Sequence, residues 1–81
     1  MPTVFREAKL RAFFYSNEGD PREPIHIHVR RGSAEVKLWL EPWPTVARST
    51  GFAARELAAI VRLVRDRRAE IEAAWHEHFG D

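Results

Sequence analysis

In the segment Glu23–Arg30, branched apolar residues alternate with two histidines and an arginine, and this pattern constrains the fold more than any other feature of the chain. Successive side chains of an extended strand point to opposite faces of a sheet. One face therefore carries Ile25, Ile27 and Val29, and the other carries His26, His28 and Arg30. The two imidazoles should lie roughly 7 Å apart, as the rise of a strand requires. The sequence thus predicts a strand that concentrates ionisable side chains on one side of a sheet.

A second alternating segment follows after a short turn. Arg31-Gly32-Ser33 suits a hairpin loop, because glycine adopts positive φ without strain. The returning strand, Ala34–Leu40, again separates aliphatic from polar residues. If the core faces of the two strands agree, the opposite face carries His26, His28, Arg30, Glu35, Lys37 and Trp39. Because the outer face of an antiparallel sheet ordinarily meets water, we expect these six side chains to be exposed.

The sequence predicts two more strands and an end to the sheet. Residues 3–6 and the aromatic-rich stretch 10–16 are expected to be strands, the second covered by a helix on one face and lined by aromatic side chains on the other. Turn-forming residues over 17–24 predict a loop. Two prolines in Glu41-Pro42-Trp43-Pro44 cannot stay in a ladder, so the sheet should end there, and residues 45–49 are expected to form a helical turn.

One long C-terminal helix is predicted over about residues 54–79. Its apolar residues recur at helical spacing, and Gly80 is placed to terminate it. The apolar stripe is interrupted at Arg67 and Arg68, whose aliphatic stems can cover the sheet while their charged ends stay in water. The predicted fold is α+β: a small antiparallel sheet of three or four strands over about residues 3–40, with the helix packed on one face, in a single domain of 81 residues.

Size and composition exclude several classes of protein. The chain has no cysteine, so neither disulfides nor thiolate metal sites can stabilise it. It shows no leader sequence and no apolar run of about 18 residues, so we expect a cytoplasmic protein without a membrane span. A chain this short buries only about 60–65% of its unfolded surface, which favours self-association, for example as a homodimer. Eleven of the 13 basic residues are arginine, which binds carboxylate and phosphate groups, although the net charge is only +1.

Three interpretations of His26 and His28 stay open. As an acid–base pair they would titrate near neutral pH and could catalyse RNA cleavage or nucleotidyl chemistry. The phosphate contacts would then be Arg30 and Lys37. As ligands of a divalent metal ion the two histidines would need further donors, although the sequence requires no cofactor. The metal ligands would be His26, His28, Glu35 and His76. In the third interpretation both histidines are polar residues of a solvated strand.

The three tryptophans differ in their expected roles. Trp75 lies on the apolar side of the predicted helix and is expected in the core. Trp39 lies on the histidine face, where an aromatic ring can stack on a base or bind a partner. Trp43 stands between two prolines and is expected to be an exposed contact residue. The residues predicted to bind a partner or ligand are thus Arg30, Lys37, Trp39 and Trp43.

Five short motifs follow one another along the chain. They are Met1-Pro2-Thr3-Val4-Phe5, Phe13-Phe14-Tyr15-Ser16-Asn17-Glu18-Gly19, Pro24-Ile25-His26-Ile27-His28-Val29, Lys37-Leu38-Trp39-Leu40-Glu41-Pro42 and Trp75-His76-Glu77. Together they closely resemble the small bacterial and archaeal proteins called domain of unknown function 4160, over essentially the whole chain. The chain departs at Ala53, where related sequences tend to have a serine that would cap the helix together with Glu56. Alanine forfeits about 1 kcal/mol of that stabilisation.

The resemblance implies a biological setting but no catalytic residues. It implies a component of a prokaryotic toxin–antitoxin-type module that binds a partner protein encoded nearby, with nucleic acid as a further candidate ligand. The alternatives are a non-catalytic homodimeric interaction module and a histidine-based metal-binding protein. The sequence leaves open whether the chain is an enzyme, whether it is the toxin or the antitoxin, and whether RNA or DNA is bound.

Overall fold

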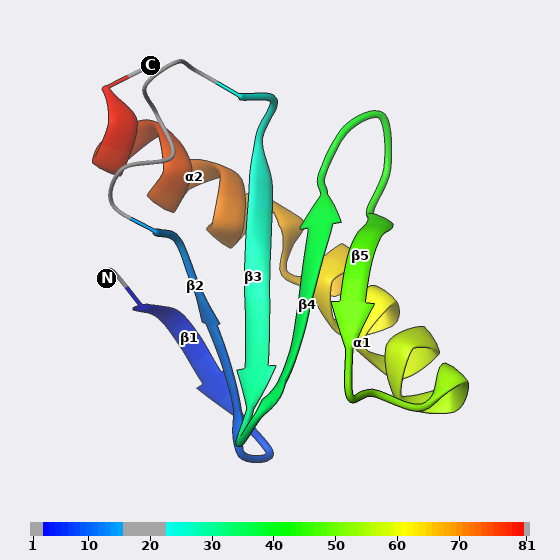
Figure 1. The fold of residues 1–81 in the computed structure, drawn as a ribbon. Helices are drawn as coiled ribbons and strands as arrows, with labels where there is room; N and C mark the ends of the chain where they lie inside the picture. The colour runs from blue at the N-terminus through cyan, green and yellow to red at the C-terminus, as the bar shows by residue number, and fades with distance from the viewer. Residues whose placement is uncertain (1–2, 16–22, 81) are drawn as a thin grey trace.

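The computed structural model describes residues 3–15 and 23–80. Within them the chain forms a five-stranded antiparallel sheet, in the order β1-β2-β3-β4-β5, and two helices (Figure 1). The elements are β1 (Thr3–Glu7), β2 (Leu10–Phe13), β3 (His26–Arg31), β4 (Ala34–Trp39), β5 (Thr45–Thr50), α1 (Ala54–Asp66) and α2 (Arg68–Phe79). The predicted α+β class is confirmed, whereas the predicted three or four strands and single helix are too few. Most of the predicted loop over 17–24 lies outside the described residues.

Strand β5 replaces the helical turn expected over residues 45–49. Its sequence, Thr-Val-Ala-Arg-Ser-Thr, contains several β-branched residues, which favour an extended backbone. Both prolines lie in the connection between β4 and β5, where no ladder hydrogen bond is required of them. β5 pairs with β4 with Lys37 opposite Arg48, and the register shifts between Lys37 and Leu38. The sheet therefore extends past residue 40, and β5 forms one of its two edges.

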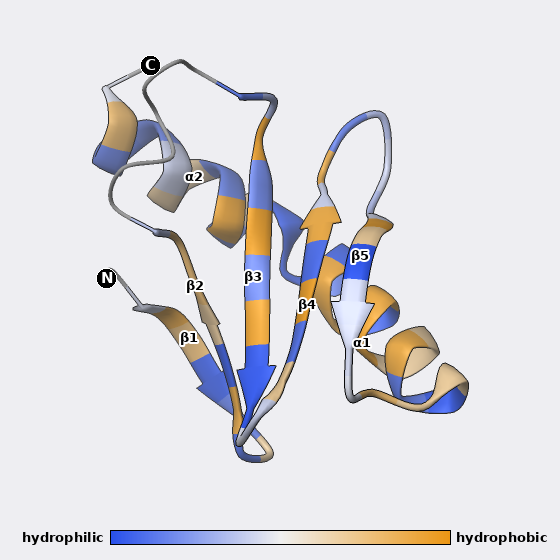
Figure 2. Cartoon of the chain, in the orientation of Figure 1, coloured by the Kyte–Doolittle hydropathy of each residue, from blue (hydrophilic) through white to orange (hydrophobic). Residues whose placement is uncertain are grey.

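Both helices pack on one face of the sheet, against the aliphatic side of β3 and β4 (Figure 1). Figure 2 shows the alternation of hydrophobic and hydrophilic residues along β3 that the sequence predicts. The almost fully buried aliphatic residues of this core include Ile27, Val29, Val36, Leu38, Val64 and Ile71. The helical spacing of apolar residues is confirmed, as is the core position of Trp75. None of the described helices is both long and apolar enough to cross a membrane.

The predicted long helix is interrupted at Arg67. Its φ and ψ of −106° and 19° depart from helical values, so α1 ends and α2 begins there. The guanidinium carbon of Arg67 lies 4.3 Å from the centre of the Phe5 ring, and its Nη2 donates to Glu7 Oε1 at 2.7 Å. Arg68 Nη1 donates to the Pro42 carbonyl oxygen at 3.0 Å. The two arginines that interrupt the apolar stripe thus join the helices to β1 and to the β4–β5 turn.

Two glycines occupy backbone conformations that other residues rarely adopt. Gly51, between β5 and α1, has a φ of 87°, and a Cβ there would lie 3.0 Å from the Cβ of Ala34. Gly80 has a φ of 78°, and its N–H donates to the His76 carbonyl oxygen at 2.8 Å. This left-handed residue ends α2, which confirms the predicted role of Gly80.

The N-terminus of α1 is only partly capped. Ala53 is the N-cap residue, and its N–H donates to Glu56 Oε1 at 2.8 Å. The Glu56 carboxylate also forms an ion pair with Arg31 at the end of β3. Because alanine has no side-chain acceptor, the reciprocal hydrogen bond of a capping box cannot form.

We expect Ala53→Ser to complete this capping box. Ala53 has φ and ψ of −75° and 160°, which suit an N-cap serine whose hydroxyl accepts from the N–H of Glu56. The free energy of unfolding, measured by urea denaturation, should rise by about 1 kcal/mol. Ala59→Ser, at an exposed position within α1, is the control and should lower it by about 0.5 kcal/mol. The prediction is contradicted if Ala53→Ser does not raise the free energy of unfolding.

Glu56 should make stability depend on pH in the acid range. The pKa of its carboxyl group is lowered by the hydrogen bond from the Ala53 N–H, and further by Arg31. Stabilisation is therefore complete above the unfolded pKa of about 4.3 and is lost as the pH falls through the lower folded pKa. The melting temperature of Glu56→Gln should lie below that of the unmodified protein at neutral pH, and the two should converge below about pH 4.

A second variant separates the two causes of this pH dependence. Arg31→Ala removes the ion pair but keeps the backbone hydrogen bond, so part of the pH dependence should persist. A melting-temperature difference between Glu56→Gln and the unmodified protein that stays constant from neutral to acid pH would show that the carboxylate charge contributes nothing.

Candidate functional site

The register of the sheet brings the six predicted side chains onto one face. β3 and β4 pair so that the opposite residues are His26 and Trp39, His28 and Lys37, and Arg30 and Glu35. Directly opposite residues of antiparallel strands point to the same side of the sheet. The shared face predicted from the two alternating segments is therefore confirmed, and it is the face away from the aliphatic core.

The two histidines on this face are buried, contrary to the expectation that they are exposed. His26 is 0% exposed and His28 is 1% exposed. Phe13 of β2 lies opposite His28, and their stacked rings have centroids 5.6 Å apart. The ring of Tyr15 lies 4.6 Å from that of His28. Phe13 at the end of β2 and Tyr15 just after it thus cover the imidazole of His28, which the alternation within β3 could not indicate.

His26 is enclosed by tryptophans from two different elements. Its ring centroid lies 5.6 Å from Trp39 of β4, 5.1 Å from Trp75 of α2 and 5.3 Å from His28. Trp75 also packs in the aliphatic core, so its ring connects the two sides of the sheet. We call this group the aromatic–histidine cluster, and its members are Phe13, Tyr15, His26, His28, Trp39 and Trp75.

A hydrogen bond fixes the orientation of His26. Its Nδ1 lies 2.9 Å from the carbonyl oxygen of Pro24. Because a carbonyl oxygen only accepts, Nδ1 carries a proton, and a neutral ring then has its lone pair on Nε2. A general acid or base must contact the group with which it exchanges a proton. Rings that are 0% and 1% exposed cannot contact a substrate in this conformation, which disfavours the catalytic interpretation of His26 and His28.

Glu35 of β4 contacts β3 and the segment that follows β2, beside the cluster. The Tyr15 hydroxyl donates to Glu35 Oε2 at 3.1 Å. The same carboxylate lies 3.5 Å from His28 Nδ1 and 3.9 Å from Arg30 Nη1. Arg30, one of the predicted phosphate contacts, keeps 46% of its side chain exposed.

Lys37, the other predicted phosphate contact, is buried in an ion pair. The residue is 6% exposed, and its Nζ lies 2.9 Å from Glu23 Oε1. The ammonium group also lies 4.4 Å from the centre of the Trp39 ring, which is half-buried. A buried lysine requires such a partner, so Lys37 has a structural role in addition to any contact with a ligand.

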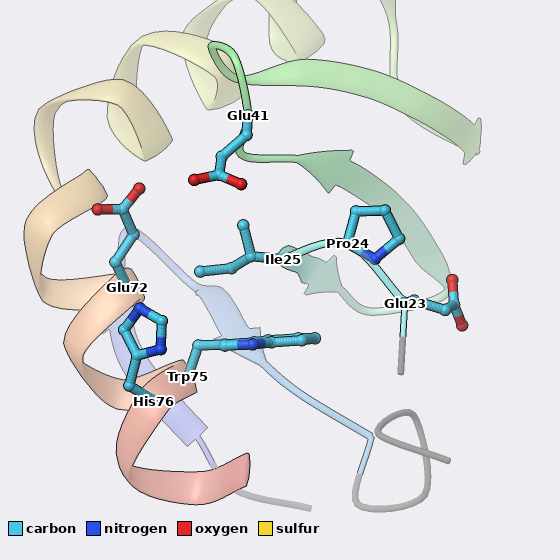
Figure 3. A pocket seen from close by; sticks show the side chains of 7 residues that line it. All are labelled: Glu23, Pro24, Ile25, Glu41, Glu72, Trp75 and His76. Atoms are coloured by element: carbon cyan, nitrogen blue, oxygen red, sulfur yellow. The ribbon is translucent and has the colours of Figure 1, made fainter. Parts of the chain in front are cut away.

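Of the four predicted metal ligands, His26, His28 and Glu35 are neighbours, but they do not converge on one point and His76 lies apart from them. Across residues 3–15 and 23–80, no three His, Asp or Glu side chains converge as a metal site requires. His76 lies instead on α2 in a separate pocket (Figure 3). The hypothesis of a metal site formed by His26, His28, Glu35 and His76 is therefore not supported by the arrangement of these residues.

The pocket that contains His76 is acidic and has an apolar base. It has a volume of about 270 Å³, and its lining residues are Glu23, Pro24, Ile25, Glu41, Glu72, Trp75 and His76. Figure 3 shows Glu41, from the β4–β5 turn, and Glu72, from α2, extending toward the same opening. Glu72 is paired with Arg68 at 2.7 Å, whereas Glu41 forms no ion pair with any described residue. The acidic character was missed because its glutamates come from three separate segments.

Trp43 lies on the turn beside this pocket and is 67% exposed, more than any other large hydrophobic residue that the structure describes. The turn is held from both sides. Thr45 Oγ1 donates to the Trp43 carbonyl oxygen at 2.9 Å, and Arg68 Nη1 donates to that of Pro42 at 3.0 Å. Pro44 is buried. The expectation that Trp43 is exposed is confirmed.

The burial of the histidines predicts a structural effect of mutation. His26→Ala and His28→Ala should each lower the free energy of unfolding by about 2–4 kcal/mol, because each leaves a cavity between aromatic rings. His76→Ala, which removes an exposed imidazole, should change it by less than about 0.5 kcal/mol. Urea denaturation measures all three. Equal stability of the three variants would mean that the cluster does not stabilise the fold.

Comparison with known proteins gives one family and no named relative. Searches of the curated proteins and of the solved structures gave no match. The model of a family described as a domain of unknown function, DUF4160, matches residues 10–76. The matched segment contains β2 to β5, α1 and most of α2, and therefore every residue of the aromatic–histidine cluster and of the acidic pocket. The match confirms the resemblance found in the sequence motifs, and the chain belongs to the DUF4160 family.

Proposed function

We propose that this chain is the partner-binding component of a prokaryotic toxin–antitoxin-type module and that it docks a partner protein through the turn that carries Trp43. The observation that supports this most is the 67% exposure of the Trp43 side chain in a domain whose other tryptophans are buried or half-buried. An exposed indole costs free energy in water, and tryptophan is among the residues that contribute most to protein interfaces. The exposed ring is thus suited to fill a cavity on another protein.

The turn is already ordered before a partner binds. Hydrogen bonds from Thr45 and Arg68 hold the carbonyl groups on either side of the indole, and Pro44 is packed into the protein. Ordering a loop on binding costs free energy, and a pre-ordered turn avoids that cost. Trp43 is therefore presented by a rigid support.

Charge in the neighbouring pocket favours a basic partner. Glu41 lies two residues before Trp43 and has no ion pair among the described residues, whereas Glu23 and Glu72, which share the pocket, are paired with Lys37 and Arg68. The uncompensated charge of the pocket is therefore that of Glu41. An arginine or lysine side chain of the partner could enter this pocket, which has a size suited to one side chain rather than to a drug-sized ligand. We therefore propose that the partner presents a basic residue next to the cavity that receives Trp43.

The burial of the histidines favours a binding role over a catalytic one. RNA cleavage by His26 and His28 would require both imidazoles to contact the substrate, and both are enclosed in the aromatic–histidine cluster. Binding through Trp43 requires no such opening.

The proposal is tested with the product of the adjacent open reading frame. Isothermal titration calorimetry should show binding, and Trp43→Ala should weaken it by about 30-fold or more, the effect of losing an interface residue worth about 2 kcal/mol. Trp43→Phe should recover part of the affinity because it keeps an aromatic ring. Arg55→Ala, at the opposite end of β5 in the first turn of α1, should leave the affinity unchanged.

Charge reversal tests the acidic pocket separately. Glu41→Lys should weaken binding. Glu77→Lys should have little effect, because Glu77 lies on α2 but does not line the pocket. The proposal is wrong if the unmodified protein does not bind, or if Trp43→Ala binds as tightly. It is also wrong if size-exclusion chromatography shows a dimer that Trp43→Ala dissociates, because the indole would then serve self-association.

A further inference from the structure

A second recess lies at the edge of the sheet, between β4 and β5. It has a volume of about 220 Å³ and is lined by Glu35, Lys37, Arg48, Ser49 and Thr50. Pockets for drug-sized ligands have volumes of about 300–1,000 Å³, so this recess suits a single chemical group. None of its residues is part of the Trp43 turn.

Two cationic side chains from neighbouring strands line the recess. Lys37 of β4 lies directly opposite Arg48 of β5, so their side chains point to the same face. Like charges in directly opposite positions destabilise a sheet. The ion pair with Glu23 already offsets the charge of Lys37, so the positive charge left for an anion to neutralise is mainly that of Arg48.

The two cations differ in how they are compensated. Lys37 is buried and paired with Glu23 at 2.9 Å. Arg48 is exposed, and its guanidinium group forms no hydrogen bond, ion pair or ring contact with any residue of the described ranges 3–15 and 23–80. The donors of Arg48 are therefore available to a ligand, while Lys37 adds positive potential behind them.

Glu35 on the wall of the recess does not cancel this charge. Its carboxylate already accepts a hydrogen bond from Tyr15 and lies 3.9 Å from Arg30 Nη1. The charged groups in and around the recess are two carboxylates and three cations, namely Glu23, Glu35, Arg30, Lys37 and Arg48. The recess is thus positive where Arg48 faces water.

We propose that this recess binds one phosphate group of a single-stranded nucleic acid, with Arg48 as the direct contact. Guanidinium groups match the geometry of phosphate oxygens and bind them through two parallel hydrogen bonds. Trp39 lies two residues from Lys37 on the same face, is half-buried, and has the Lys37 ammonium group 4.4 Å from its ring centre. A positive groove next to an aromatic ring is the combination by which proteins bind single strands without sequence preference. This site is independent of the Trp43 surface and requires no catalysis.

The test is fluorescence anisotropy with labelled ten-nucleotide single strands of RNA and of DNA with the same sequence, read over a range of salt concentrations. The unmodified protein should bind at least one of the two, and the tighter one identifies the natural source of the phosphate. Arg48→Ala should weaken binding by about tenfold or more. The slope of log K against log salt should fall by about 0.7, the value for one lost phosphate contact on a single strand.

Two matched variants distinguish a direct contact from a general effect of charge. Arg62→Ala removes an exposed arginine from α1, on the other side of the sheet, and should change neither the affinity nor the slope. Arg48→Lys keeps the charge and should retain the slope with weaker affinity. Arg48 is exposed at an edge strand, so its variants should fold, and circular dichroism verifies this.

Three results would overturn the proposal. The first is that neither single strand binds to the unmodified protein. The second is that Arg48→Ala loses no more affinity than Arg62→Ala. The third is that a glutamate-rich peptide binds through Arg48 more tightly than either oligonucleotide, which would assign the recess to an acidic protein segment.

Discussion

The burial of strand β3 on both faces is the constraint on which the rest of the structure depends. One side of β3 packs on the helices through Ile27 and Val29, and the other side packs under aromatic rings through His26 and His28. In a small antiparallel sheet one face is usually left to water. A chain of 81 residues has little interior, so a second packed layer supplies apolar contacts that a single core of this size could not provide.

Histidine suits the second layer because its ring is flat and partly apolar, and a ring nitrogen can still bond to the backbone. His26 stacks among tryptophans and donates to the Pro24 carbonyl oxygen, which lies at the start of its own segment. That hydrogen bond offsets part of the cost of burying the ring. With His26 and His28 enclosed in this way, both proposed binding surfaces lie at the margins of the sheet.

Much of the arrangement within segments could be predicted from the sequence. Alternation placed His28 and Lys37 on one face, and flanking prolines indicated that Trp43 is exposed. The exposure of the histidines could not be predicted, because it depends on Phe13, which meets His28 only through pairing between strands separated by a long connection. Strand β5 was missed for a related reason. The prolines of the preceding turn indicate where a strand stops but not that the chain returns to pair again, and Arg48 could therefore not be placed opposite Lys37.

The two proposed surfaces are carried by one edge of the sheet, since Trp43 lies two residues before β5 and Arg48 lies within it. Trp43 lies five positions before Arg48, which corresponds to about 16 Å at the rise of an extended chain. At physiological salt the Debye length is only about 8 Å, so the charge of a partner at Trp43 would be largely screened at Arg48. Binding at one surface should therefore change affinity at the other very little through electrostatics alone. The arrangement instead suits an adaptor, in which one small rigid sheet holds a protein and a nucleic acid close together while each is bound by its own contacts.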